Sequence, residues 1–263
     1  MGESVVPTPE ETAVVKSFDE TIVTNIGQPI KRKEDQRLLT GAGRFTDDFT
    51  MPNQSFASMV RSPYPHALIN GIDANKALSM PGVLAVITSA DVQKAHLGPI
   101  PHNPVPSTNY DLKLRAPDGM HPTVDAHYLL PEDRVRYVGE AVAMVVAESL
   151  QQAMDAVEAV IVDYFVLPHI TESKDAILPD APQLYEHIEN NVLIDTQFGD
   201  EVLTEKAFAS AAHIFEHEFH IQRVTGVTIE PRSALGSYDV DTGKFTLVAG
   251  SGGAVRQQSE IAA

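Results

Sequence analysis

The sequence predicts an α+β chain that folds as two successive units. In the first, between residues 56 and 168, short segments with an apolar residue at every second position alternate with short segments of helical period. Near the end of this unit a strand, a helix and a strand follow one another from Val135 to Pro168, which is the pattern of a β-α-β motif. A loop-rich stretch from Thr171 to Gly199 separates it from a second set of helix and strand patterns.

The first unit is expected to begin in irregular chain. Residues 1–24 are polar and acidic with weak periodicity, which predicts a flexible arm, and Ile26–Asp48 predicts an ordered loop with a helical turn at Glu34–Leu39. The segments that follow are expected as strand 56–61, strand 66–73, helix 74–80, strand 82–88 and helix 89–95. Asp73 and Ser89 are the expected N-caps of the two helices.

A long loop and the β-α-β pattern complete the first unit. Leu97–Tyr128 is rich in Pro, His and Asn and has little periodicity, and loops of this length are usually functional or interfacial. Strands are then expected at 136–147 and 160–168, on either side of a helix at 149–160 that Ser149 caps. The apolar residues at helical spacing on this helix are Leu150, Ala153, Met154 and Val157.

The second unit is expected to contain one helix, further strands and a last helix. The expected elements are a helix at 201–212, a strand at 213–224, the segment 227–240, a turn at Asp241–Gly243 and a strand at 244–250. Ser251–Ala263 reads as a glycine-rich turn that opens a helix, and no capping or breaking residue follows it. We therefore expect Ala263 to be a truncation, a split-subunit end or a gene boundary.

Composition excludes several classes of function. The formal net charge is −17 and no stripe of Lys and Arg interleaved with aromatic residues is present, so nucleic-acid binding through a basic face is not expected. The chain has no cysteine, which excludes disulfides, thiolate metal sites, iron–sulfur ligation and a cysteine nucleophile within it. It has no long apolar run, and its beginning lacks the pattern of a signal peptide, so we expect a cytoplasmic protein without a membrane span.

One segment gathers five side chains of the types that bind metals: His213, Glu216, His217, Glu218 and His220. A zinc protease requires His-Glu-x-x-His, and here isoleucine follows the first histidine, so that motif is absent. If the segment is a strand, as its alternation indicates, Glu216 and Glu218 lie on one face and His217 on the other. The pattern favours a half-exposed strand, and a histidine-based zinc or copper site is the weaker hypothesis.

The stretch GSGGAVRQ, at the end of the strand expected at 244–250, is a glycine-rich turn at a strand-to-helix junction. Backbone N–H groups at such a helix N-terminus can hold an anion. The stretch lacks the Gly-Lys-Ser/Thr ending of a P-loop and the G-x-G-x-x-G spacing of a dinucleotide fold, so the pattern supports a structural turn equally well. No Ser-His-Asp arrangement stands out, and the carboxylate pairs Glu34–Asp35 and Asp47–Asp48 predict solvated loops.

Several longer sequence motifs occur together in this chain: IGQPIKRKEDQRLLTGAGRFTDD, VRSPYPHALINGID, ALSMPGVLAVITSADV, VRYVGEAVAMVVAES and VDYFVLP. Together they closely resemble the N-terminal third of the molybdopterin-binding large subunits of the xanthine dehydrogenase, aldehyde oxidase and aerobic carbon monoxide dehydrogenase family, the molybdenum hydroxylases. The resemblance extends over about Ile26–Ala263. It implies an α/β hammerhead domain at 25–165, followed by the N-terminal portion of the first molybdopterin-binding domain at 166–263, to which the motif Ile229–Arg232 belongs.

The resemblance also implies a chemistry. In this family the reaction is hydroxylation at an electron-poor carbon, for which molybdopterin, carrying molybdenum and present as a cytosine dinucleotide, performs the difficult step. Two 2Fe–2S clusters and FAD, carried by partner subunits or fused domains, then receive the electrons. The absence of cysteine from this chain agrees with that division of labour.

The resemblance places the cofactor's edge near the glycine-rich turn. Many family members carry Ser/Thr-Gln after the strand that matches Lys244–Ala249, whereas this chain has Gly250–Gly253 there and its Gln257 comes later, in the helix. Backbone donors or a guanidinium would then take the place of that glutamine. The cofactor-binding residues implied are Gly252, Gly253 and Arg256. The resemblance implies no catalytic residue and no metal ligand in this chain.

We expect the chain to form a wall of the substrate channel and part of the molybdopterin pocket of such an oxidoreductase, and to be inactive without further polypeptide. The expected partners are the remaining cofactor-binding polypeptide of the large subunit, an FAD-binding medium subunit, a 2Fe–2S small subunit and a small-molecule substrate. The alternative is a non-catalytic assembly or interaction module, or a truncated fragment. A neighbouring reading frame that encodes the rest of the large subunit would favour the split enzyme.

Overall fold

The computed structural model describes residues 27–101, 125–196, 198–222, 224–250 and 252–262. The arm predicted at 1–24 and the middle of the loop predicted at Leu97–Tyr128 lie outside these residues. The strands are β1 (Phe56–Arg61), β2 (Ala67–Asp73), β3 (Val83–Ile87), β4 (Arg134–Val135), β5 (Ala141–Ala147), β6 (Ile161–Val166), β7 (Ala234–Asp239) and β8 (Lys244–Ala249). The helices are α1 (Asp35–Leu39), η2 (Thr46–Asp48), α2 (Asn75–Leu78), α3 (Ser89–Lys94), α4 (Leu150–Val157), α5 (Ser173–Ala176), η4 (Glu189–Asn191), α6 (Glu201–Ser210) and α7 (Ala254–Ile261).

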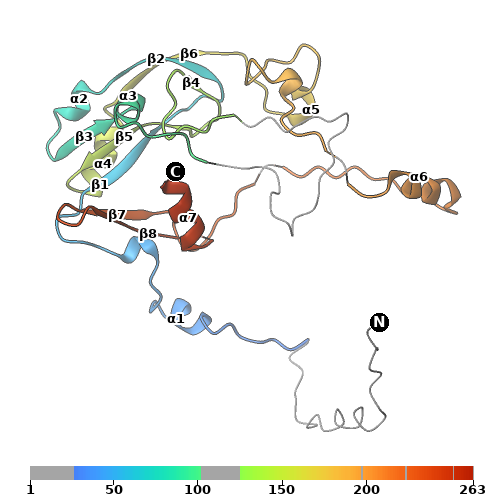
Figure 1. Ribbon diagram of the computed structural model, residues 1–263, viewed down its shortest axis with the longest axis horizontal. Helices are drawn as coiled ribbons and strands as arrows, with labels where there is room; N and C mark the ends of the chain where they lie inside the picture. Colours follow the sequence, from blue (N-terminus) through green and yellow to red (C-terminus); the bar gives the residue numbers. More distant parts are fainter. Residues whose placement is uncertain (1–26, 102–124, 197, 223, 251, 263) are drawn as a thin grey trace, which may run out of the picture.

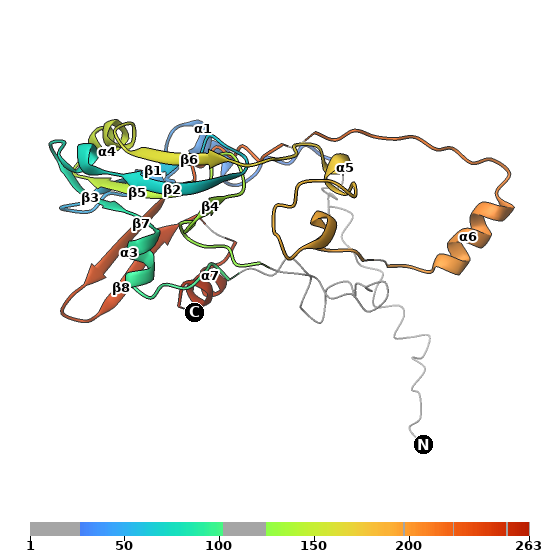
Figure 2. The same ribbon diagram turned by 90° about the horizontal axis from the view of Figure 1, so that it is seen from above.

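Two three-stranded antiparallel sheets, with strand orders β1-β5-β3 and β4-β2-β6, form the first unit (Figure 1). Helix α4 packs across β1 and β5 (Figure 2), and its Ala153 and Ala156 are fully buried there. The helix begins at the predicted cap, because the Ser149 Oγ accepts a hydrogen bond from the Gln152 N–H at 3.3 Å. The largest fully buried side chains of this core are Val135, Val142 and Val145.

The N-caps predicted for the two shorter helices are each wrong by one residue. Ala74, and not Asp73, directly precedes α2, although the Asp73 Oδ1 accepts a hydrogen bond from the Asn75 N–H at 2.9 Å; Thr88, and not Ser89, directly precedes α3. At α3, the Asp91 carboxylate accepts a hydrogen bond from the Thr88 N–H at 2.8 Å, and this bond holds the pKa of Asp91 below its ordinary value. Thr88 and Ser89 have similar capping ability, so the sequence alone does not decide between them.

The β-α-β motif predicted between Val135 and Pro168 is wrong, although its strand, helix and strand are present. Such a motif requires two parallel strands in one sheet. Here β5 lies between β1 and β3, whereas β6 pairs with β2 in the other sheet, and every strand pair among the described residues is antiparallel. The alternation of apolar residues identifies a strand but contains no information about its partner.

The second unit consists of α6, the β7–β8 hairpin and α7. The hairpin turns at Asp241–Gly243 as predicted, where the Asp239 Oδ1 accepts a hydrogen bond from the Asp241 N–H at 3.0 Å. The strand predicted at 213–224 is wrong: residues 213–222 run from α6 back toward β7 without helix or strand structure (Figure 2). Among the described residues no neighbouring strand pairs with them, so the ladder that defines a strand is missing.

Candidate functional site

The glycine-rich turn lies between the end of β8 and the start of α7. Gly253 directly precedes α7 with a φ of 152°, a conformation that favours glycine. A Cβ atom added at Gly252 or Gly253 would meet no other atom within 4 Å, so a ligand can approach the backbone of both residues closely. The turn is therefore open, and it leads into the N-terminus of an eight-residue helix.

Arg256 lies on α7 beside this turn and is exposed. Its Nε donates a hydrogen bond to the Glu260 Oε1 at 2.8 Å, and this bond with the charge of Glu260 raises the pKa of the guanidinium. The structure thus brings the three predicted cofactor-binding residues to one helix start. It also shows that Arg256 already has a partner four residues further along the same helix.

A hollow of about 610 Å³ lies next to the turn. Its lining residues are Thr228, Glu230, Pro231, Arg232, Ser233, Ala234, Ala249, Gly250 and Gln257. The motif Ile229–Arg232 and the end of β8 thus meet at one place, together with Gln257. Gln257 comes after the turn in the sequence and is not among the cofactor-binding residues that the family resemblance implies. The helical period could have indicated this position, because a residue four positions after Gly253 lies one helical turn above it. The Gln257 N–H accordingly donates a hydrogen bond to the Gly253 C=O at 3.3 Å.

Glu230 connects this hollow to the beginning of the chain. Its Oε1 accepts hydrogen bonds from the Thr46 N–H at 3.2 Å and from the Thr46 Oγ1 at 3.1 Å, across 184 residues of sequence. The same carboxylate lies against Gly250, where an added Cβ would meet Oε1 at 3.3 Å. Since Thr46 is buried, these contacts fix the wall of the hollow against η2. No sequence pattern indicates this pair.

A second, smaller hollow of about 180 Å³ lies in the first unit around the buried Glu140. The Glu140 Oε2 accepts a hydrogen bond from the Arg136 N–H at 2.6 Å, and the Arg136 guanidinium lies 4.6 Å from the centre of the Tyr185 ring. Burial raises the pKa of both Glu140 and Tyr185 above their ordinary values. This cluster has charge and aromatic character, but no sequence motif indicates it.

Replacing Glu140 with glutamine is expected to remove a pH dependence of stability. Because the pKa of Glu140 is higher in the folded chain than in the unfolded one, the folded state binds more protons between these two pKa values. The contribution of Glu140 to stability is therefore complete below its pKa in the unfolded chain, and it is lost as the pH rises through its pKa in the folded chain. The glutamine amide oxygen still accepts the hydrogen bond from Arg136.

Urea unfolding of both chains between about pH 4 and pH 7 measures this difference. Glu132→Gln is the control, because Glu132 is exposed in the same region and its replacement leaves Glu140 in place. The expectation is contradicted if Glu140→Gln unfolds with the same pH slope as the unaltered chain.

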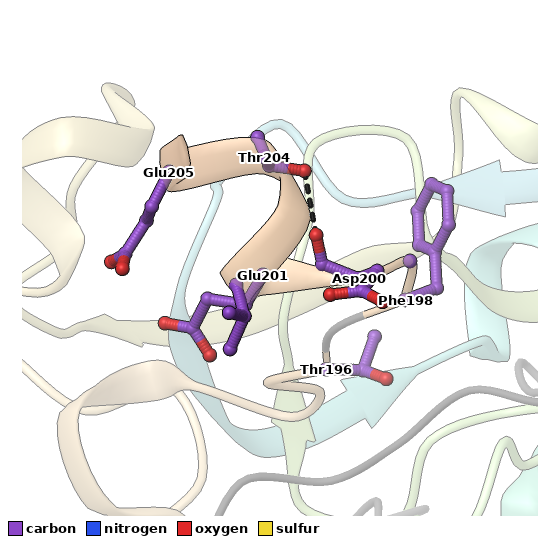
Figure 3. A pocket seen from close by; sticks show the side chains of 8 residues that line it. Thr196, Phe198, Asp200, Glu201, Thr204 and Glu205 are labelled. Carbon is purple, nitrogen blue, oxygen red and sulfur yellow. Dashed lines mark hydrogen bonds between the residues drawn. The ribbon is translucent and has the colours of Figure 1, made fainter. Parts of the chain in front are cut away.

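A further hollow lies beside the start of α6 (Figure 3). Its lining includes three carboxylates, those of Asp200, Glu201 and Glu205. The Asp200 Oδ1 accepts a hydrogen bond from the Leu203 N–H at 2.9 Å, and the Thr204 Oγ1 donates to the Asp200 C=O at 2.7 Å. Because its own acidic side chain caps this helix and further acidic side chains surround it, the hollow does not suit an anionic ligand.

The histidine-rich segment does not assemble a metal site in the part of the chain that the structure describes. No group of three or more His, Asp and Glu side chains there lies close enough to hold an ion. Glu218 pairs instead with Lys174 of α5, and the His217 ring contacts the Phe219 ring edge-on at 4.7 Å. Among the described residues, too, no helix is long and apolar enough to cross a membrane.

Two family models match the chain in succession. The α/β hammerhead domain of aldehyde oxidase and xanthine dehydrogenase matches residues 40–168, and the molybdopterin cofactor-binding domain matches residues 184–263. Their identity and order confirm the predicted fold class, a hammerhead domain followed by part of a molybdenum-cofactor-binding domain. The hollow beside the glycine-rich turn lies within the second match.

Curated relatives and solved structures agree with these matches. The chain is similar to the carbon monoxide dehydrogenase large chain of Afipia carboxidovorans, with 32% identity over 82% of this chain and 26% of the relative. It is 35% identical to the nicotine 6-hydroxylase large subunit of Paenarthrobacter nicotinovorans, over 81% of this chain and 24% of that subunit. Quinoline 2-oxidoreductase from Pseudomonas putida 86 superposes with a TM-score of 0.65 and 32% identity, over 83% of this chain and 26% of that one. The chain spans about a quarter of the length of these relatives.

Proposed function

Because the chain belongs to the aldehyde oxidase and xanthine dehydrogenase family of molybdenum hydroxylases, we propose that it supplies one wall of the molybdopterin pocket and of the substrate channel in a large subunit. The observation that carries this proposal is the meeting of the glycine-rich turn, the motif Ile229–Arg232 and Gln257 around one hollow. The remaining part of the large subunit completes the pocket, so this chain alone is inactive.

The residues of the glycine-rich turn and of the hollow beside it fit one side of a bulky, polar, anionic group. The backbone at Gly252 and Gly253 is open to close approach, and the N–H groups at the start of α7 favour negative charge. The buried Ser233 Oγ, in the wall of the hollow, has no hydrogen-bond partner among the described residues. A ligand with polar groups would supply that partner.

We propose the following roles for this chain's residues. Gly252 and Gly253 let the backbone reach the edge of the cofactor, and Arg256 holds a negative group once its guanidinium leaves Glu260. Gln257 presents its amide to the hollow. The molybdenum cofactor, when bound, supplies the oxidative chemistry at the substrate carbon, and these residues bind and orient it.

The proposal includes a cytosine dinucleotide form of the cofactor, and FAD and 2Fe–2S clusters on partner subunits. The absence of cysteine supports only the placement of the 2Fe–2S clusters on partner subunits, since these clusters need thiolate ligands from another domain or chain. The proposed hammerhead domain extends over 25–165 and the proposed portion of the molybdopterin-binding domain over 166–263. The predicted arm at 1–24 lies outside the described residues.

Co-expression of the chain with its genomic neighbours tests the proposal. We expect the purified complex to contain molybdenum and pterin in about equal amount to the chain, and to oxidise an aldehyde or an N-heterocycle with an artificial electron acceptor. The chain purified alone is expected to contain neither and to show no turnover. A complex free of molybdenum, or turnover by the chain alone, contradicts the proposal, and a metal-free complex would favour an assembly role.

A matched pair of variants tests the assigned residues in that complex. Arg256→Ala removes the guanidinium, whereas Glu260→Gln weakens the same ion pair and keeps the guanidinium. If Arg256 holds the cofactor, molybdenum occupancy falls several-fold in the first variant and is retained in the second. Equal occupancy in both variants would show that Arg256 has no part in binding.

A further inference from the structure

Residues 213–221, called the edge segment here, have one apolar and one polar face. Counted at every second position, one mainly apolar face carries Phe215, Phe219 and Ile221, whose side chains are 94%, 79% and 84% exposed, together with His213 and His217. The other, mainly polar face carries Glu216, Glu218 and His220 beside Ile214, and Glu218 pairs with Lys174. Such large exposure of two phenylalanines and an isoleucine on one face is unfavourable for a folded chain in water.

The backbone of the edge segment makes no hydrogen bonds to the other residues that the structure describes. Among the described residues, no backbone hydrogen bond joins residues 213–221 to any other part of the chain. The neighbouring β7–β8 hairpin has only two strands, and an isolated hairpin is marginally stable in water. Unpaired N–H and C=O groups along an extended, one-sidedly apolar segment are what a strand presents at the edge of a sheet.

We propose that the edge segment pairs as a β-strand with a strand from the remaining part of the molybdopterin-binding large subunit, with the apolar face of Phe215, Phe219 and Ile221 buried in the shared core. This inference rests on the proposed function, and it names the segment through which this chain joins the rest of the large subunit. The segment lies inside the region matched by the cofactor-binding domain, and the aligned part of this chain covers only 26% of the carbon monoxide dehydrogenase large chain. The rest of such a large subunit is therefore available to cover the face.

A second copy of the chain is a poorer occupant. Parallel pairing in register, or antiparallel pairing centred on His217, places the carboxylates of Glu216 and Glu218 opposite carboxylates of the other copy. Like charges directly across a strand pair are destabilising. The net charge of −17 adds repulsion between two copies.

Hydrogen exchange tests the pairing. Amide exchange over 213–221 is measured in the chain alone and in the large subunit assembled with its remaining part. We expect exchange to slow by at least about tenfold on assembly, because a strand ladder protects alternate amides. Unchanged exchange in an assembled, molybdenum-containing subunit overturns the inference and leaves the proposed function standing. If no assembly forms, both fail. Protection in the chain alone, with dimers seen by sedimentation, makes a second copy the occupant and overturns the inference.

Two variants place the same charge on opposite faces. Phe219→Glu alters the apolar face and Gln222→Glu continues the polar one, and both positions are exposed in the chain alone. We expect Phe219→Glu to weaken assembly at least about tenfold and Gln222→Glu to change it little, while both keep the thermal unfolding of the unaltered chain. Equal effects on assembly would contradict the assignment of the faces.

Discussion

Replacing Ala153 with glutamate is expected to lower the free energy of unfolding of the first unit by about 3–5 kcal/mol, since it leaves an unpaired charge in a packed interface. Ala153 is fully buried where α4 meets β1 and β5. The same replacement at Met154, one residue further, is expected to cost less than about 1 kcal/mol, because Met154 is half exposed. Hydrophobicity alone predicts the opposite order, since methionine is the larger apolar side chain.

Urea unfolding followed by circular dichroism compares the two variants, and both carry the same added charge on the same helix. Leu150→Glu is a second control, because Leu150 is also half exposed. If the Met154 variant loses as much stability as the Ala153 variant, the helix packs through a different face from the one described.

The contrast shows which part of the fold the sequence predicts. The apolar period correctly located α4 and its cap at Ser149. It also grouped Leu150 and Met154 with Ala153, whereas the structure buries Ala153 and Ala156 and leaves the two larger residues half exposed. Close approach of a helix to a sheet selects small side chains, and this is a property of the interface that no local pattern contains.

Local sequence patterns also did not predict which distant strands pair with each other. The strands β5 and β6 were expected from their alternation, but their membership of different sheets depends on β1, β2 and β3. The edge segment shows the converse case. Its alternation predicted a strand, and the described chain lacks the neighbouring strand that would pair with it.

The candidate site divides in the same way. The glycine-rich turn at Gly252 and Gly253 was predicted, because such a turn between a strand and a helix is a local signal, whereas a cofactor-binding role for these glycines came only from the family resemblance. The contact of Glu230 with Thr46 spans 184 residues and leaves no local trace. Only the folded structure reveals this contact, and its energy can be measured directly.

Replacing Glu230 with alanine is expected to lower the free energy of unfolding by about 1–3 kcal/mol. The substitution removes the acceptor of two hydrogen bonds from the buried Thr46, and leaves the Thr46 N–H without that partner. It also removes the group that lies against Gly250, so the strand end beside the glycine-rich turn loses its support. We expect this variant to release molybdenum from the assembled subunit more readily than the unaltered chain does.

A double-mutant cycle separates the contact from other effects of the substitution. Glu230→Ala and Thr46→Val are expected to be coupled by about 1 kcal/mol, because each removes one partner of the same hydrogen bond. Thr228→Val is the matched control. Its hydroxyl donates to the Glu230 main-chain oxygen at 2.6 Å and not to the carboxylate, so its effect is expected to add to that of Glu230→Ala. Coupling near zero between Thr46 and Glu230, measured by urea unfolding, would mean that the carboxylate does not hold η2 to the wall of the hollow, and the expected loss of molybdenum would lose its physical basis.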